Sequence, residues 1–222
     1  MPSQNGAAVI AFPGRRSSGT QAQTRMLVAH GYRVLLFDRR GEGASEGDGN
    51  MFGWGGERDI FAALDFLEDR PDVDPGRIGG IGLSVGGELM LEAAAEDDRL
   101  AAVVSEGAGT RSLGEEVQEF DGLGMVVSLP LFALKTAAVA VFSNTPPPPN
   151  LTDLVPRIAP GPTLFIWAPN GGNVEGMNRT YHRLAGPNSM IWEIDDARHI
   201  RGLATHPAEY ELRVVAFFDA AL

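Results

Sequence analysis

The feature that most constrains this chain is a repeated alternation of short apolar runs with helical patterns. The intervening stretches place apolar residues at helical spacing, as in 56–69, where Ile60, Leu64 and Leu67 share one face. The apolar runs do not alternate strictly with polar residues, which is typical of parallel strands buried on both faces. We therefore predict an α/β domain whose active site lies beyond the carboxyl ends of the strands. The runs predicted as strands are 7–12, 32–37, 78–83, 101–105, 163–167 and 189–194.

One long segment interrupts this alternation. We expect residues 1–109 and 151–222 to form the core and residues 110–150 to form a small helical lid inserted into it. The apolar stretch 122–142 is long enough to suggest a membrane span. Pro130, Lys135 and the lack of charged flanks argue against a span and favour a helix packed over the sheet, so we expect no membrane partner.

Composition excludes several classes of function. With 18 basic against 29 acidic residues, the net charge of −11 argues against nucleic-acid binding. The absence of cysteine excludes disulfides, cysteine–zinc sites and thiol nucleophiles. No pair of histidines has metal-ligand spacing, so we expect no metal and no organic cofactor. The start of the sequence has no signal-peptide pattern, and we expect a cytoplasmic protein.

The strongest chemical signal is the sequence Gly82-Leu83-Ser84-Val85-Gly86. It has the form GxSxG and falls between a predicted strand and a predicted helix, where a nucleophile elbow requires it. Glycines two residues before and after the serine allow a sharp turn that exposes its hydroxyl. The following N–H, that of Val85, and the helix N-terminus would favour a developing oxyanion. We predict that Ser84 is a nucleophile.

A nucleophilic serine needs a general base, and histidine is the usual one. His199 follows the last predicted strand, at the sheet edge where Ser84 also lies, and it is our candidate. The order of serine first and histidine last suits an α/β-hydrolase. The sequence also contains His30, His182 and His206, which we expect at helix ends and on a polar helix face.

These motifs together carry a family resemblance. The features that contribute are the Phe12-Pro13-Gly14 turn, the loop Asp38–Ser45, the elbow, the late His199 and a terminal helix that ends in Val214–Leu222. From residue 7 onward the chain resembles an α/β-hydrolase, of the small serine esterase and dienelactone-hydrolase-like branch. The resemblance implies the α/β-hydrolase fold, a mostly parallel sheet with helices on both faces. The loop would be structural, because its glycines permit a tight turn.

The sequence departs from the family pattern at three places. Pro13-Gly14 replaces the usual His-Gly, so the second oxyanion N–H would come from the backbone of Arg15. The one or two antiparallel strands that normally precede the first parallel strand are missing, so we expect a minimal or incomplete N-terminus. The usual aspartate after strand 163–167 is also missing. Glu175 is then the candidate triad acid, and Glu106, after strand 101–105, is the alternative.

The expected activity is hydrolysis of carboxylic esters with small to medium acyl groups through an acyl-enzyme on Ser84. A peptidase or amide hydrolase would use the same residues and could recognise a substrate amine with acids of the lid. Glu115, Glu116 and Glu119 are candidates for this, although a solvated helix face is the simpler interpretation. An inactive binding module is a further alternative. The expected partner is a small-molecule ester, and the sequence is compatible with a homo-oligomer.

Overall fold

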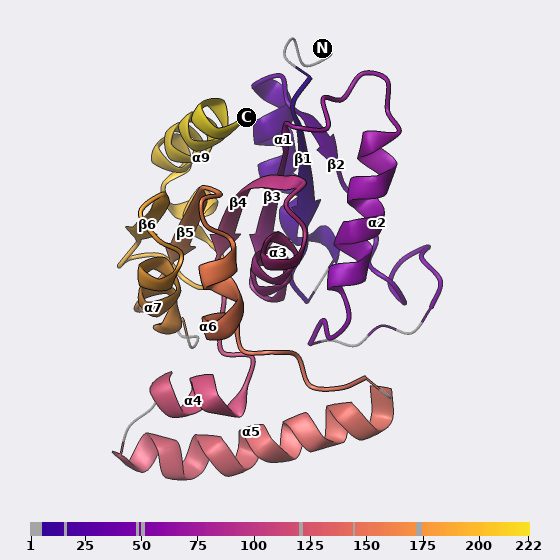
Figure 1. The fold of residues 1–222 in the computed structure, drawn as a ribbon. Helices are drawn as coiled ribbons and strands as arrows, with labels where there is room; N and C mark the ends of the chain where they lie inside the picture. The colour runs from indigo at the N-terminus through magenta and orange to yellow at the C-terminus, as the bar shows by residue number, and fades with distance from the viewer. Residues whose placement is uncertain are drawn as a thin grey trace.

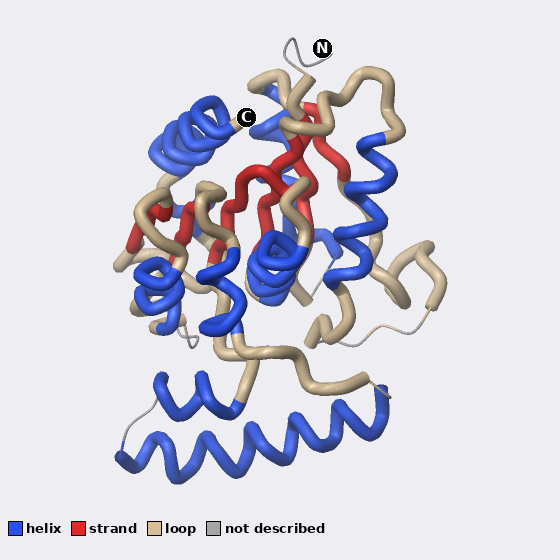
Figure 2. Tube along the Cα trace, viewed as in Figure 1, coloured by secondary structure: helices blue, strands red, loops and turns tan. Residues whose placement is uncertain are grey.

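The core of the protein is a parallel sheet with the strand order β2-β1-β3-β4-β5-β6 (Figures 1 and 2). The computed structural model describes residues 6–15, 17–47, 49, 52–119, 122–143, 145–171 and 175–222. Every pairing between neighbouring strands in this part of the chain is parallel, which confirms the predicted α/β fold. The strands are β1 (Ala8–Phe12), β2 (Arg33–Leu35), β3 (Ile78–Leu83), β4 (Leu100–Glu106), β5 (Thr163–Trp167) and β6 (Ser189–Glu193).

Helices cover both faces of the sheet because each strand sends alternate side chains to opposite sides. Ile10 and Phe12 of β1 point to one core and Val9 to the other. The first core is closed by α2 (Glu57–Glu68), α3 (Val85–Glu96), α6 (Leu151–Leu154) and α7 (Met177–Leu184). The second is closed by α1 (Gln21–Ala29) and α9 (Pro207–Ala221). Shorter turns are η1 (Ser17–Thr20), η2 (Val155–Arg157) and α8 (Gly202–Thr205).

Two predicted boundaries differ from the observed ones. The strand expected over 32–37 is paired only from Arg33 to Leu35, because β2 is the edge strand and its ladder with β1 ends there. The helical pattern over 18–30 predicts a helix that starts at Ser18, but the segment begins as the 3₁₀ turn η1 before α1.

The strand order reverses direction between β1 and β3. The chain leaves β1 toward β2 on one side and later enters β3 on the other side. Loops that leave these two strands therefore diverge and open a crevice at their carboxyl ends, which is where open α/β sheets bind ligands. Ser84 follows β3, and the Pro13-Gly14 turn follows β1.

The inserted segment forms α4 (Leu113–Glu119) and α5 (Gly122–Ser143), which lie as a separate layer below the core in Figure 1. The predicted helix over 122–142 is present. Its expected packing against the sheet is not, since only 6% of the residues in the apolar part of α5, Gly124–Ser143, are buried. The helix α5 packs mainly on α4, and its Phe132 side chain is buried.

Buried carboxylates attach α4 to the core. Glu115 accepts hydrogen bonds from the backbone N–H of Arg111, at 2.9 Å, and of Thr152, at 3.0 Å. Glu116 accepts one from the Thr110 hydroxyl at 2.7 Å. Glu115 and Glu116 are buried, so the expectation that they belong to a solvated helix face is wrong. Glu115 thus accepts hydrogen bonds from N–H groups just before α4 and in the first turn of α6, and Glu116 accepts one from a hydroxyl; sequence spacing does not reveal these contacts.

Candidate active site

The turn between β3 and α3 holds Ser84 in a strained conformation. Its φ of 55° and ψ of −123° lie in a region that residues with a side chain rarely occupy. Two backbone hydrogen bonds fix the turn: the Ser84 N–H donates to the Glu106 carbonyl at 2.7 Å, and the Gly87 N–H donates to the Ser84 carbonyl at 2.8 Å. The turn thus places the Ser84 side chain at the carboxyl end of the sheet.

The flanking glycines are required by space. A Cβ at position 86 would lie 2.5 Å from the carbonyl oxygens of both Phe12 and Pro13. A Cβ at position 82 would collide with the backbone of Gly86 and Gly87. The first turn of α3 can therefore approach the end of β1 only because neither position carries a side chain.

His199 connects Ser84 to Glu175. Its Nε2 lies 3.0 Å from Ser84 Oγ, and its Nδ1 is hydrogen-bonded to Glu175 Oε1. The second oxygen of Glu175 accepts the Ala168 N–H at 3.0 Å. Because a carboxylate only accepts hydrogen bonds, Nδ1 must donate, and the lone pair of Nε2 then faces the serine hydroxyl.

The three side chains come from different strands. Ser84 follows β3, Glu175 lies between β5 and α7, and His199 follows β6. The imidazole of His199 lies over the residue after β4: a Cβ at Gly107 would lie 3.1 Å from its Nδ1. Gly107 therefore leaves the space in which the imidazole lies, a role that was not predicted from the sequence. The glycine directly after the buried strand β4 is the signal in the sequence that could have indicated it.

Glu106 has another set of contacts. It is fully enclosed, and its carboxylate accepts the Tyr210 hydroxyl at 2.6 Å and the Gly202 N–H at 2.9 Å. Burial raises the pKa of Glu106, although both hydrogen bonds act in the opposite direction. The structure thus brings Glu175, and not the alternative Glu106, into hydrogen-bond contact with His199. Glu106 ties the end of β4 to the segment that follows His199.

The loop after β1 lies against the elbow. A Cβ at Gly14 would lie 2.9 Å from the Leu83 carbonyl oxygen and 3.2 Å from Ser84 Cβ. The backbone that enters Arg15 is therefore adjacent to Ser84. Val85 is the first residue of α3, so its N–H has no acceptor within the helix. Of the two residues named from the sequence, Val85 thus follows the serine directly, and Arg15 follows the glycine that packs against the elbow.

A small cavity adjoins these two residues. Its volume is about 40 Å³, and it lies between the elbow and the inner face of α5. An ion cluster forms one wall, in which Arg111 Nη1 lies 2.7 Å from Glu92 Oε2 and burial raises the pKa of Glu88. The lining residues are Arg15, Phe52, Trp54, Val85, Glu88, Thr110, Arg111, Phe132, Lys135 and Thr136.

The other histidines have separate partners. His30 contacts Glu211 at 2.6 Å, and His206 contacts Asp196 at 2.7 Å. His182 contacts the Ser189 hydroxyl at 2.7 Å. No cluster of three or more metal-ligating side chains occurs in the described part of the chain.

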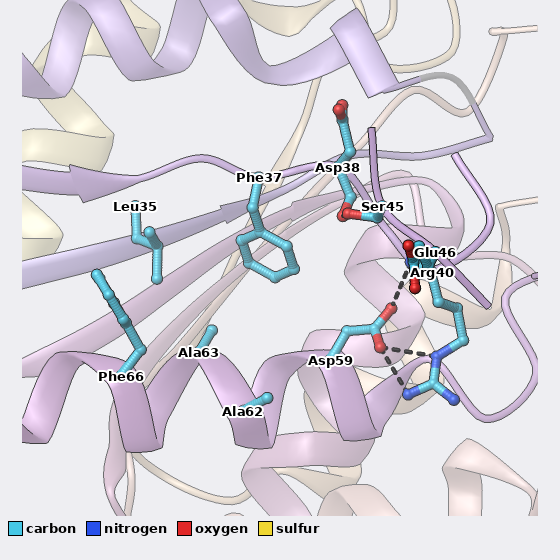
Figure 3. A pocket seen from close by; sticks show the side chains of 10 residues that line it. All are labelled: Leu35, Phe37, Asp38, Arg40, Ser45, Glu46, Asp59, Ala62, Ala63 and Phe66. Atoms are coloured by element: carbon cyan, nitrogen blue, oxygen red, sulfur yellow. Dashed lines mark hydrogen bonds and ion pairs between the residues drawn. The ribbon is translucent and has the colours of Figure 1, made fainter. Parts of the chain in front are cut away.

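A larger cavity of about 520 Å³ lies at the free edge of the sheet, between the end of β2 and α2 (Figure 3). Polar groups on its wall are paired with one another: Arg40 Nε donates to Asp59 at 2.7 Å, and the Ser45 hydroxyl donates to the Asp38 carbonyl at 2.6 Å. The glycine-rich loop after β2 is thus stabilised by a hydrogen bond within the loop and by another to α2.

The fold and this arrangement of side chains define an α/β-hydrolase. A sequence profile of the X-Pro dipeptidyl-peptidase (S15) family matches residues 11–154, more than half of the chain. The chain therefore belongs to this family, which is part of the α/β-hydrolase superfamily.

Individual relatives agree with this assignment. The putative hydrolase YtaP of Bacillus subtilis is 33% identical over 139 residues, which are 57% of this chain and 46% of the relative. The quorum-quenching protein AidA of Acinetobacter baumannii is 37% identical over 95 residues, 42% of this chain and 31% of the relative. The matched region thus spans less than half of the length of either relative.

Solved structures share the fold. The Pyrococcus furiosus esterase Pf2001 superposes with a TM-score of 0.76 and 23% identity, covering 99% of this chain and 84% of the esterase. GrgF from Penicillium gives a TM-score of 0.76 and 20% identity over 99% of this chain and 91% of GrgF.

The contact between α3 and β1 predicts a steric effect at position 86. We expect Gly86→Ala to lower the free energy of unfolding by about 2–4 kcal/mol, because the atoms it would meet are backbone and cannot rotate away. Gly19→Ala is the matched control, since its Cβ would meet nothing within 4 Å. Urea unfolding measures both variants. Equal stability of the two would contradict the proposed contact.

The raised pKa of Glu106 predicts a pH effect on stability. The folded protein keeps the proton of the Glu106 carboxyl group to a higher pH than the unfolded chain does. The contribution of Glu106 to the free energy of unfolding therefore falls as pH rises from 4.5, the ordinary pKa of this group, through the raised pKa. An amide does not titrate. The stability of the wild type relative to Glu106→Gln should therefore fall as pH rises above 4.5, the ordinary pKa of the carboxyl group.

Urea unfolding at several pH values tests this effect. Glu209→Gln, at an exposed carboxylate, corrects for the change in net charge. A stability difference that is flat or rises with pH would be inconsistent with the burial of Glu106.

Proposed function

We propose that this chain is a serine esterase that cleaves carboxylic esters with short acyl groups. The observation that carries the proposal is the hydrogen-bonded sequence Glu175–His199–Ser84, set at the reversal point of the sheet. Such an arrangement activates a hydroxyl for attack on a carbonyl carbon. Glu175 fixes the tautomer of His199 and stabilises the imidazolium that forms.

The reaction has two steps. In the first, Ser84 Oγ bonds to the ester carbonyl carbon while His199 Nε2 takes the hydroxyl proton, and that proton then leaves with the alcohol. In the second, His199 takes a proton from water, the hydroxide attacks the acyl carbon, and the proton returns to Ser84 as the carboxylic acid departs. The N–H groups of Arg15 and Val85 stabilise the negative oxygen in both steps.

The cavity beside Val85 supports a short acyl group. Its volume of about 40 Å³ has room for about three water molecules, since one needs roughly 10–15 Å³. Of the large apolar residues of α5, Phe132 reaches this cavity, whereas Val126, Leu131 and Leu134 are exposed on the helix. The apolar composition of α5 therefore gives no support for a longer acyl group.

Peptide hydrolysis is the second candidate, because the family profile is that of a dipeptidyl-peptidase. The acidic residues of the inserted segment give little support to peptide hydrolysis, because they are poorly placed to bind a substrate amine. Glu115 and Glu116 are buried in the contacts that hold α4, and Glu119 accepts the Gly176 N–H at 2.9 Å. A substrate amine would have to displace these hydrogen bonds.

The first prediction concerns the nucleophile. Ser84→Ala should lower kcat/KM for p-nitrophenyl acetate by about a thousandfold or more, because the substitution removes the hydroxyl that faces His199 Nε2. A fluorophosphonate probe should label the wild type at Ser84. Ser143→Ala, on α5, is the control serine and should retain activity and labelling.

Three outcomes would contradict the proposal. Hydrolysis retained by Ser84→Ala would exclude this nucleophile, and absence of labelling would indicate an inactive binding module. Faster cleavage of X-Pro p-nitroanilides than of p-nitrophenyl esters would assign the site to peptide hydrolysis.

The second prediction separates the two acids. Glu175→Gln should also lower kcat/KM, but the fold loss should be about a hundred times smaller than that of Ser84→Ala. The base remains in this variant, and only its orientation is lost. Glu106→Gln should affect stability more than kcat/KM, since its carboxylate binds Tyr210 and Gly202. The reverse order of effects on kcat/KM would identify Glu106 as the acid.

A further inference from the structure

The surface of α5 has the reverse of the usual polarity. Amphipathic helices of globular proteins turn apolar residues to the core and polar residues to water. In α5, by contrast, Lys135 and Thr136 line the cavity beside the elbow, and Ser128 is half-buried. Among the α5 residues whose burial the structure describes, 124–143, the exposed side chains are all apolar: Val126, Val127, Pro130, Leu131, Leu134, Ala137, Val141 and Phe142.

These exposed residues form one continuous strip, which we call the outer strip. At 100° per residue they fall within an arc of about 160° along the helix. No charged or hydrogen-bonding side chain interrupts the strip, and Phe142 is 90% exposed. The segment Gly124–Ser143 has a mean hydropathy of 2.0, high enough for a membrane helix, yet it is neither a buried core helix nor N-terminal.

The attachment of α5 excludes a spanning orientation. Its 22 residues are about 33 Å long, close to the thickness of a bilayer's hydrocarbon core. Both ends must stay on one side, because α4 is hydrogen-bonded to the core and α6 is part of it. Residues 144–150 separate α5 from α6, and seven residues extend over at most about 25 Å. They cannot cross back over the membrane.

We propose that α5 lies flat in the surface of a neutral, zwitterionic lipid bilayer, with the outer strip in the hydrocarbon boundary. An in-plane helix buries one apolar face about 5–10 Å deep and needs no polar partner. The net charge of −11 and the absence of a cation on the outer strip disfavour an anionic surface. Figure 1 shows α5 as the outermost layer of the molecule, so the core would not hinder this approach.

A second copy of the chain is the competing occupant, and the strip fits it less well. Interfaces between copies are only about two-thirds apolar and carry roughly one hydrogen bond per 100–200 Å². The outer strip offers no side chain for such bonds along its length. Two chains that each carry a charge of −11 would also repel one another.

Vesicle binding tests this proposal. The purified protein is mixed with phosphatidylcholine vesicles, with and without added phosphatidylglycerol, and the bound fraction is measured by flotation. We expect binding to phosphatidylcholine that weakens with the anionic lipid. The double variant Leu131→Gln/Leu134→Gln should bind these vesicles with an affinity that is lower by about tenfold or more. Leu212→Gln is the matched control, since Leu212 of α9 and Leu134 are both 69% exposed.

Two further measurements define the geometry. Tryptophan fluorescence of Val126→Trp and Phe142→Trp, quenched by spin-labelled lipids, should give equal shallow depths at the two ends of α5. Analytical ultracentrifugation without lipid should give a monomer. Ser84→Ala should bind vesicles like the wild type, so that lipid binding is judged separately from the proposed esterase activity.

The proposal is overturned by any of three results. These are no flotation of the wild type with phosphatidylcholine, unequal depths at the two ends, or a dimer that Leu131→Gln/Leu134→Gln dissociates while Leu212→Gln does not. The last result would assign the outer strip to a second copy of the chain.

Discussion

The strained turn at Ser84 is the constraint on which the rest of the site depends. A positive φ at a residue with a side chain persists only when its surroundings hold it. Here the Glu106 carbonyl binds the turn from β4, and the first turn of α3 packs directly on the carbonyls that end β1. The same packing that makes the sheet compact therefore places the hydroxyl, the adjacent N–H groups and the crevice in one location. Ile200, with a φ of 49°, adds a second strained residue directly after His199.

Buried carboxylates perform two separate tasks around this site. Glu175 is directed at His199, whereas Glu106, Glu115 and Glu116 satisfy N–H and O–H groups that would otherwise be buried without partners. The second group connects chain segments that are distant in sequence: β4 to α8 and α9, and α4 to α6. A carboxyl group buried for this reason has a strong effect on stability and little need to contact a substrate.

The inserted helix α5 faces two environments. Its inner face contributes Phe132, Lys135 and Thr136 to the small cavity beside Val85. Its outer strip is apolar and uncovered, which a helix in water alone does not favour. A neutral lipid surface would satisfy both faces at once, because the polar side chains stay with the protein and the apolar ones enter the lipid.

The sequence alone determined the parallel sheet, the elbow and the position of the histidine. These follow from local rules: apolar periodicity, glycine spacing and the place of a residue after its strand. Tertiary structure decided which acid meets His199, because Glu106 and Glu175 both follow strands and only three-dimensional packing directs one to Tyr210 and the other to the imidazole. It also decided the role of Gly107 and the exposure of α5. Contacts between distant segments leave no local pattern in a sequence. Neither does the choice of which face is exposed in a helix that is apolar almost all round.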